Sequence, residues 1–90
     1  MNKDYQRPPT RTITSIIQNI RDRTDRNGNP YLVLEINNDN VIFVFSGKAL
    51  RDKWETFKAN FEVNSEYEFE VEEGKGGASI LRTFKKLEQR

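Results

Sequence analysis

The sequence has 90 residues, enough for one small domain with a modest core. Hydrophobic residues make up 34% and charged residues 32%, which is typical of a small globular domain with much exposed surface. The absence of cysteine and histidine excludes disulfides, thiolate metal sites and the commonest general base. The net charge of +1 excludes a polycation, and no apolar run approaches the roughly 20 residues of a membrane span. We therefore expect a soluble cytoplasmic protein that is not an enzyme, with no cofactor, metal, membrane or small-molecule substrate.

Residues 1–11 are polar, contain a Pro-Pro pair and show no periodicity, which predicts a flexible N-terminal arm before a single domain over residues 12–88. The first expected strand covers residues 12–21. Its isoleucines occupy both alternation registers, positions 13 and 17 and then 16 and 20. This change of register predicts a bulge halfway, as a strand that curls around a small barrel requires.

Residues 22–30 read as a turn, because Asn27-Gly28 supplies a positive φ and Pro30 leads into the next strand. Two strands follow, over residues 31–37 and 41–46, joined by an Asn-rich hairpin loop.

The number of residues in that loop decides which side chains of the two strands face outward. With an even number, the inward residues are Leu32, Leu34, Ile36, Val41, Phe43 and Phe45, and the outward ones are Tyr31, Val33, Glu35, Ile42 and Val44. We favour this register. A three-residue loop flips the third strand and exposes Phe43 and Phe45 instead.

Residues 48–60 predict a helix, because one stripe of it and the residue that follows carries Leu50, Trp54, Phe57 and Phe61. The fourth strand, residues 65–73, alternates strictly between apolar residues and glutamates. Glutamates in one row of one strand lie about 7 Å apart, so they do not converge on a metal ion. A glycine-rich loop and a last strand over residues 79–87 complete the chain.

This element order, β-β-β-α-β-β, predicts an all-β protein with one helix: a five-stranded OB-fold Greek-key barrel. OB-folds most often bind single-stranded nucleic acid or oligosaccharide. The charges support the first ligand. Residues 55–73 hold one Lys and seven Glu, whereas residues 74–90 hold five basic residues and one acidic one. The cations near the two loops that flank the platform of strands two and three are Arg21, Arg23, Arg26, Lys75, Arg82 and Lys85.

The run DRNGNPYLVLEINNDNVIFVF, residues 25–45, resembles OB-fold nucleic-acid-binding domains of replication protein A and of the anticodon-binding type found in synthetases and polymerases. The resemblance extends over residues 12–86. It implies ligand contacts at Arg21, Arg23, Arg26, Tyr31, Val33, Ile42, Val44, Lys75 and Arg82. Many of these domains place two stacking aromatics on the platform, whereas the favoured register leaves one, Tyr31.

The predicted function is binding of single-stranded DNA or RNA with low sequence specificity, in replication or repair. Tyr31, Val33, Ile42 and Val44 would support bases, and the basic residues, Lys85 included, would hold phosphates. The alternative is a protein–protein interaction module of a larger replication, repair or RNA-processing assembly. Its partner would bind the apolar face of strands two and three, at Val33, Ile42 and Val44.

Overall fold

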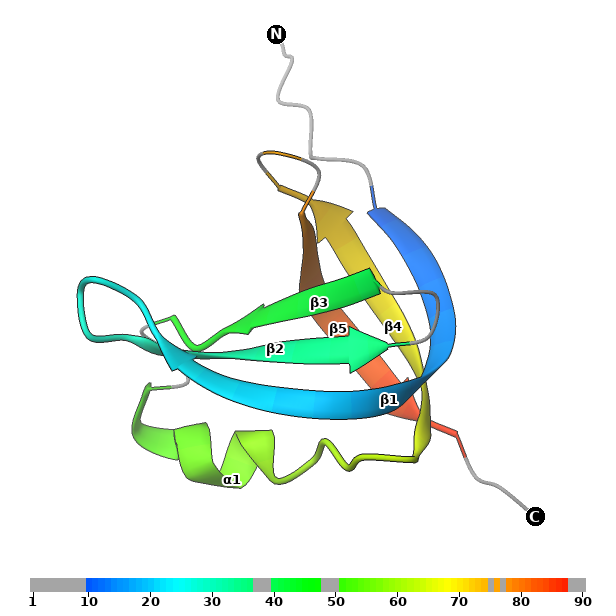
Figure 1. Cartoon of the computed structure of the whole chain (residues 1–90), viewed down its shortest axis with the longest axis horizontal. Helices are drawn as coiled ribbons and strands as arrows, with labels where there is room; N and C mark the ends of the chain where they lie inside the picture. The colour runs from blue at the N-terminus through cyan, green and yellow to red at the C-terminus, as the bar shows by residue number, and fades with distance from the viewer. Residues whose placement is uncertain (1–9, 37–39, 48–50, 75, 77, 88–90) are drawn as a thin grey trace, which may run out of the picture.

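A computed structural model describes residues 10–36, 40–47, 51–74, 76 and 78–87 of the chain. Five strands form a closed barrel in the order β1-β2-β3-β5-β4, with one short helix between β3 and β4 (Figure 1). The strands are β1 (Thr10–Thr24), β2 (Pro30–Ile36), β3 (Asn40–Phe45), β4 (Glu66–Glu73) and β5 (Ser79–Lys86). The predicted OB-type barrel is confirmed.

The long strand β1 joins both halves of the barrel. Its first half pairs with β4 and its second half with β2, both antiparallel. The register shifts between Ile17 and Asn19, so the predicted bulge is confirmed and Ile17 and Ile20 both face the core. The strand begins at Thr10, and Thr10 and Arg11 therefore belong to it and not to the predicted arm.

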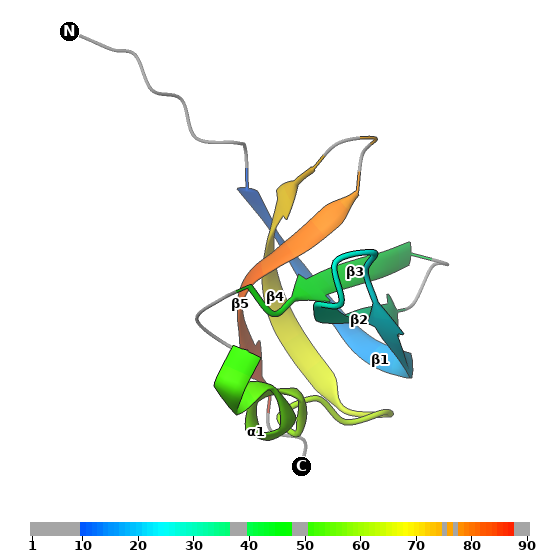
Figure 2. The same ribbon diagram turned by 90° about the vertical axis from the view of Figure 1, so that its left-hand side faces the viewer.

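The helix is shorter than predicted. A 3-10 turn, η2 (Arg51–Lys53), leads into α1 (Trp54–Lys58), which lies below the barrel in Figure 2. The helix ends early because Asn60 and Phe61 form tighter hydrogen bonds, to the carbonyls of Phe57 and Lys58, and the Asn60 side chain also donates to the Phe57 carbonyl. Residues 48–50, with Leu50 of the predicted stripe, lie outside the described residues.

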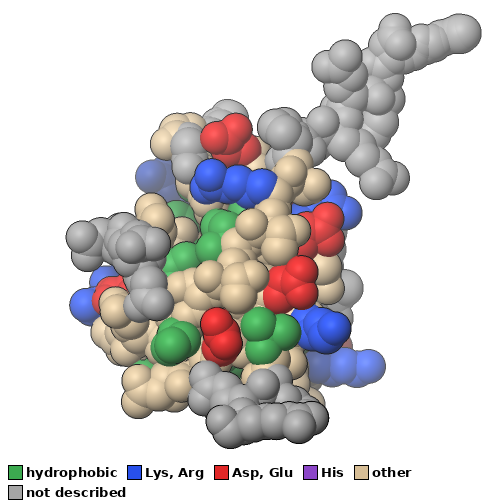
Figure 3. All heavy atoms as spheres, turned by 90° about the vertical axis from the view of Figure 1, so that its right-hand side faces the viewer, with side chains coloured by type: hydrophobic (Ala, Val, Ile, Leu, Met, Phe, Trp, Pro, Cys, Tyr) green, Lys and Arg blue, Asp and Glu red, His purple; other side chains and the backbone are tan. Residues whose placement is uncertain are grey.

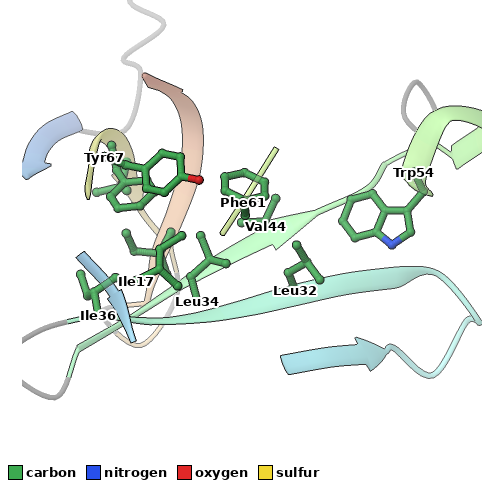
Figure 4. Close-up of a cluster of buried hydrophobic side chains, with 11 residues drawn as sticks. Ile17, Leu32, Leu34, Ile36, Val44, Trp54, Phe61 and Tyr67 are labelled. Carbon is green, nitrogen blue, oxygen red and sulfur yellow. The ribbon is translucent and has the colours of Figure 1, made fainter. Parts of the chain in front are cut away.

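The core is a cluster of side chains from the strands, the helix α1 and the segment after it (Figure 4). Of the predicted helix stripe, Trp54 and Phe61 are buried and Phe57 packs against the core. Tyr67 is fully buried, and its hydroxyl donates to the Asn60 carbonyl and accepts from the Glu62 N–H, each at 2.8 Å. These bonds fasten the segment after α1 to β4, so the helix is held against the end of the barrel.

The favoured register between β2 and β3 is wrong. Ile36 pairs with Asn40, Leu34 with Ile42, and Leu32 with Val44, which leaves three residues between the strands. Ile42 and Val44 are therefore core residues, 0% and 2% exposed, and Figure 4 labels Val44 within the core. A close-packed interior that already holds four aromatic rings accepts compact branched side chains here more readily than two further phenylalanines.

Candidate nucleic-acid interface

The flipped register creates an outer face of three cross-strand rows, which we call the platform. It lies on the second half of β1, on β2 and on β3. Since β2 buries its even-numbered residues, its odd-numbered residues and their pairing partners face outward. The rows are Arg23–Tyr31–Phe45, Arg21–Val33–Phe43 and Asn19–Glu35–Val41.

Three aromatic rings gather at one corner of the platform. The centroid of the Tyr31 ring lies 5.4 Å from that of Phe45 and 6.4 Å from that of Phe43. The Phe43 and Phe45 rings are 6.1 Å apart and nearly parallel, with an interplanar angle of 10°. Phe45 is 48% exposed, whereas Tyr31 and Phe43 are half-buried and support it. Such a cluster offers flat apolar faces on which bases can stack.

Two arginines stand beside this cluster with their charges unpaired. Arg23 is the pairing partner of Tyr31, and Arg26 lies in the hairpin between β1 and β2. Both are exposed, and among the described residues neither has a carboxylate within salt-bridge distance. Guanidinium groups in this position can bind phosphate through two N–H donors.

The hairpin that carries Arg26 is ordered by its own hydrogen bonds. The Asp25 carboxylate accepts from the N–H groups of Asn27 and Asn29, each at 2.9 Å. Gly28 has φ 85°, as the turn prediction required. These backbone donors, that of Asn29 foremost, hold the pKa of Asp25 below its ordinary value of 3.8. The hairpin therefore presents Arg26 from a defined turn.

Arg21 lies on the platform but is engaged. Its guanidinium donates to the carboxylate of Glu35, which belongs to the next row. The hydrogen bond from Arg21 lowers the pKa of Glu35 below its ordinary value of 4.5. The charge of Arg21 is thus already balanced within the platform.

The platform continues onto β5 over a short parallel pairing. Ile80 is the pairing partner of Phe43, and Arg82 follows two residues later. Arg82 donates to Glu72 of β4 at 3.3 Å. This cation is therefore near the edge of the platform, but it is paired.

The remaining predicted contacts do not join this group. Ile42 and Val44 are in the core, and Lys75 lies outside the described residues. Lys85 lies opposite Glu68 on the face of β4 that carries the glutamates. Figure 3 shows the right-hand side of the molecule in Figure 1, where acidic and basic side chains are interspersed. The structure thus brings together Arg21, Arg23, Tyr31 and Val33, with Arg26 at the neighbouring hairpin.

Phe43 and Phe45 are the site residues that the favoured register placed wrongly. Every residue from Val41 to Phe45 is apolar, so alternation along β3 does not show which residues face outward. Only the alternative of a three-residue loop placed Phe43 and Phe45 on the outer face. The flip places Phe43 and Phe45 beside Tyr31, so the platform carries three aromatic rings where the resemblance implied two.

The described ranges contain neither a group of three acidic side chains placed to hold a metal ion nor a helix long and apolar enough to cross a membrane.

No family model and no curated protein matches the sequence. Among solved structures, the chain is similar to the mitochondrial single-stranded DNA-binding protein Rim1 from S. cerevisiae, with a TM-score of 0.69. The superposition covers 94% of this chain and 100% of that chain, at 16% sequence identity. At this identity the likeness shows the fold alone, an OB-type barrel.

Proposed function

We propose that this chain binds single-stranded nucleic acid across the platform, and that DNA is its principal ligand. The observation that carries the proposal is the cluster of Tyr31, Phe43 and Phe45, flanked by the unpaired cations Arg23 and Arg26. Rings supply stacking surfaces for bases, and arginines neutralise the phosphates that lie between them. The structural likeness to a single-stranded DNA-binding protein supports the same ligand.

In this proposal the contacts depend little on sequence. Every base has a flat face that can stack on an aromatic ring, and phosphates are the same at every position. The role is one of binding without catalysis. Binding of RNA is a second outcome to be measured, because the same contacts accept either backbone.

The protein-interaction alternative is weakened by the corrected register. Its predicted contact surface consisted of Val33, Ile42 and Val44, and two of these three side chains are inside the barrel. The exposed face in their place is aromatic and arginine-flanked, which suits nucleic acid better than an apolar partner.

The test is fluorescence anisotropy of labelled oligo-dT and oligo-U of about 20 nucleotides, titrated at low and then moderate salt. We expect the affinity for the labelled strand to fall steeply as the salt concentration rises. We also expect excess double-stranded DNA to be a poor competitor of the labelled strand. The absence of binding at low salt and high protein concentration would refute the proposal.

A matched pair of variants locates the ligand. Phe45→Ala removes the exposed ring and should weaken binding about 5- to 150-fold, since stacking contributes about 1–3 kcal/mol per base. Val63→Ala shortens a side chain of similar exposure, 44%, outside the platform, and should leave binding unchanged. Equal effects of the two variants would show that the strand does not cross the ring cluster.

A further inference from the structure

Glu35 is the one acidic residue among the nine platform residues. It occupies the middle of the third row, between Asn19 and Val41, and points outward from a strand whose other outward residues are Tyr31 and Val33. A carboxylate on a surface that receives phosphates raises the energy of any phosphate that approaches it. Its presence there therefore needs a reason other than solubility.

A contribution to the stability of the fold, through the ion pair with Arg21, does not explain why Glu35 lies on the platform. Arg21 pairs in register with Val33, and it reaches diagonally across the strands to Glu35. The two side chains are 49% and 33% exposed, and exposed ion pairs contribute little to stability. The consequence of the pair for binding is larger, because it neutralises the cation nearest the centre of the platform.

We infer that Glu35 is a specificity-determining residue of the platform. Its ion pair with Arg21 prevents Arg21 from binding a phosphate, so the bound nucleic-acid strand contacts the first and second rows but not the third. This inference rests on the proposed function. The strand then runs over Tyr31, Phe45 and Phe43 and is held by Arg23 and Arg26. Glu35 thereby restricts the domain to a short stretch of strand and to fewer phosphates than its arginines could bind.

The neighbouring surface agrees with this restricted path. Beside the base of the hairpin, a groove next to α1 has the charged lining residues Asp22, Arg23, Asp52, Glu55 and Lys58. Lys58 is already paired with Asp22 at 3.2 Å and with Glu55 at 3.4 Å. Carboxylates outnumber cations in this groove by three to two, so it offers a phosphate no net positive charge.

The experiment compares salt dependence for the wild-type protein, Glu35→Gln and the double variant Glu35→Gln/Arg21→Gln, each titrated against labelled oligo-dT. Glutamine keeps the size of the side chain and removes its charge, so Arg21 is released. We expect Glu35→Gln to bind several-fold more tightly at low salt, with a salt slope steeper by about 0.7, the value of one further phosphate. The double variant should return to the wild-type slope.

Glu70→Gln is the matched control. It removes the same charge from an exposed position on β4, where its pairing partners are Thr12 and Thr83, and should leave the slope unchanged. An unchanged slope in Glu35→Gln would overturn the inference, and so would an equal steepening in Glu70→Gln, which would assign the effect to net charge. The wild-type titration judges the proposed function by itself: if wild type does not bind, both fall, whereas binding without a difference between wild type and Glu35→Gln removes only the role of Glu35.

Discussion

The two faces of this barrel are built from the same strand and carry opposite chemistry. Before its bulge, β1 pairs its threonines at positions 10, 12 and 14 with glutamates of β4, and we call this region the acidic face. After the bulge, β1 sets Arg21 and Arg23 beside Val33 and Tyr31 of β2. The bulge reverses which alternate residues of β1 point outward, so one strand serves both faces. The net charge of +1 conceals this division.

The difference teaches how a nearly neutral domain can favour a polyanion. On the acidic face, β4 presents Glu68, Glu70 and Glu72, and Lys85 of β5 lies opposite Glu68. On the platform, Arg23 is unpaired and adjoins the ring cluster. We therefore expect a strand to be confined to the platform, because phosphates are attracted there and repelled on the opposite face.

The largest expected effect is a difference between aspartate substitutions at two adjacent residues of β3, Val44 in the core and Phe45 on the platform. Val44→Asp buries an unpaired carboxylate in the core and should destabilise the fold by about 3–5 kcal/mol. Phe45→Asp places the same charge on the exposed platform, so the fold should persist while binding of oligo-dT is lost. Urea denaturation followed by Trp54 fluorescence measures the first effect, and anisotropy measures the second.

This pair also tests the register directly. If Phe45→Asp unfolded the protein and Val44→Asp did not, the favoured register of the sequence analysis would be right after all and the platform would have to be redrawn.

A smaller effect should distinguish the two faces by charge. Arg23→Gln and Lys85→Gln each remove one positive charge from an exposed side chain. Arg23→Gln should weaken binding and flatten the salt slope by about 0.7, and addition of Arg26→Gln should flatten it by a similar amount again. Lys85→Gln should change neither quantity, because Lys85 lies opposite Glu68 on the acidic face. Equal slopes for the two single variants would mean that the ligand does not distinguish the faces.

The sequence predicted the fold well because its strongest signals were local. Strict alternation in β4, the positive φ at Gly28 and the mixed register of β1 each have one structural solution, and the structure confirms them. The stripe of Trp54, Phe57 and Phe61 does belong to a helical segment packed on the core, although α1 is shorter than the periodicity predicted.

The site was less predictable because it depends on which face of β3 points outward, and the local sequence pattern does not determine this. From Val41 to Phe45 every side chain is apolar, so either face of β3 could be buried. The choice is made by the volume inside the barrel, where Tyr67 and Phe69 from β4 already occupy space. Pairings such as that of Lys85 with Glu68 were equally hidden, since they join strands that the sequence alone does not set in register.

The smallest effect concerns acid stability on the two sides of the molecule. Hydrogen bonds from the Asn29 and Asn27 N–H groups hold the pKa of Asp25, in the hairpin beside the platform, below 3.8. The hydrogen bond from Lys86 lowers the pKa of Glu62, in the segment between α1 and β4, below 4.5. Because the folded pKa is the lower one in both cases, the stabilisation is present above the ordinary value and is lost as pH falls through the folded pKa.

The side chains introduced by Asp25→Asn and Glu62→Gln are uncharged at any pH. Each variant should therefore lose less stability than wild type between about pH 6 and pH 2.5. The measurement is the urea midpoint at the two pH values. At neutral pH, Asp25→Asn should also weaken binding of oligo-dT slightly, because the hairpin that presents Arg26 loses a charged acceptor, whereas Glu62→Gln should not. An acid-induced loss as large as that of wild type in Asp25→Asn would show that its carboxylate does not order the hairpin. The two faces would then differ in charge alone, and the position of Arg26 would have to be fixed by the bound strand.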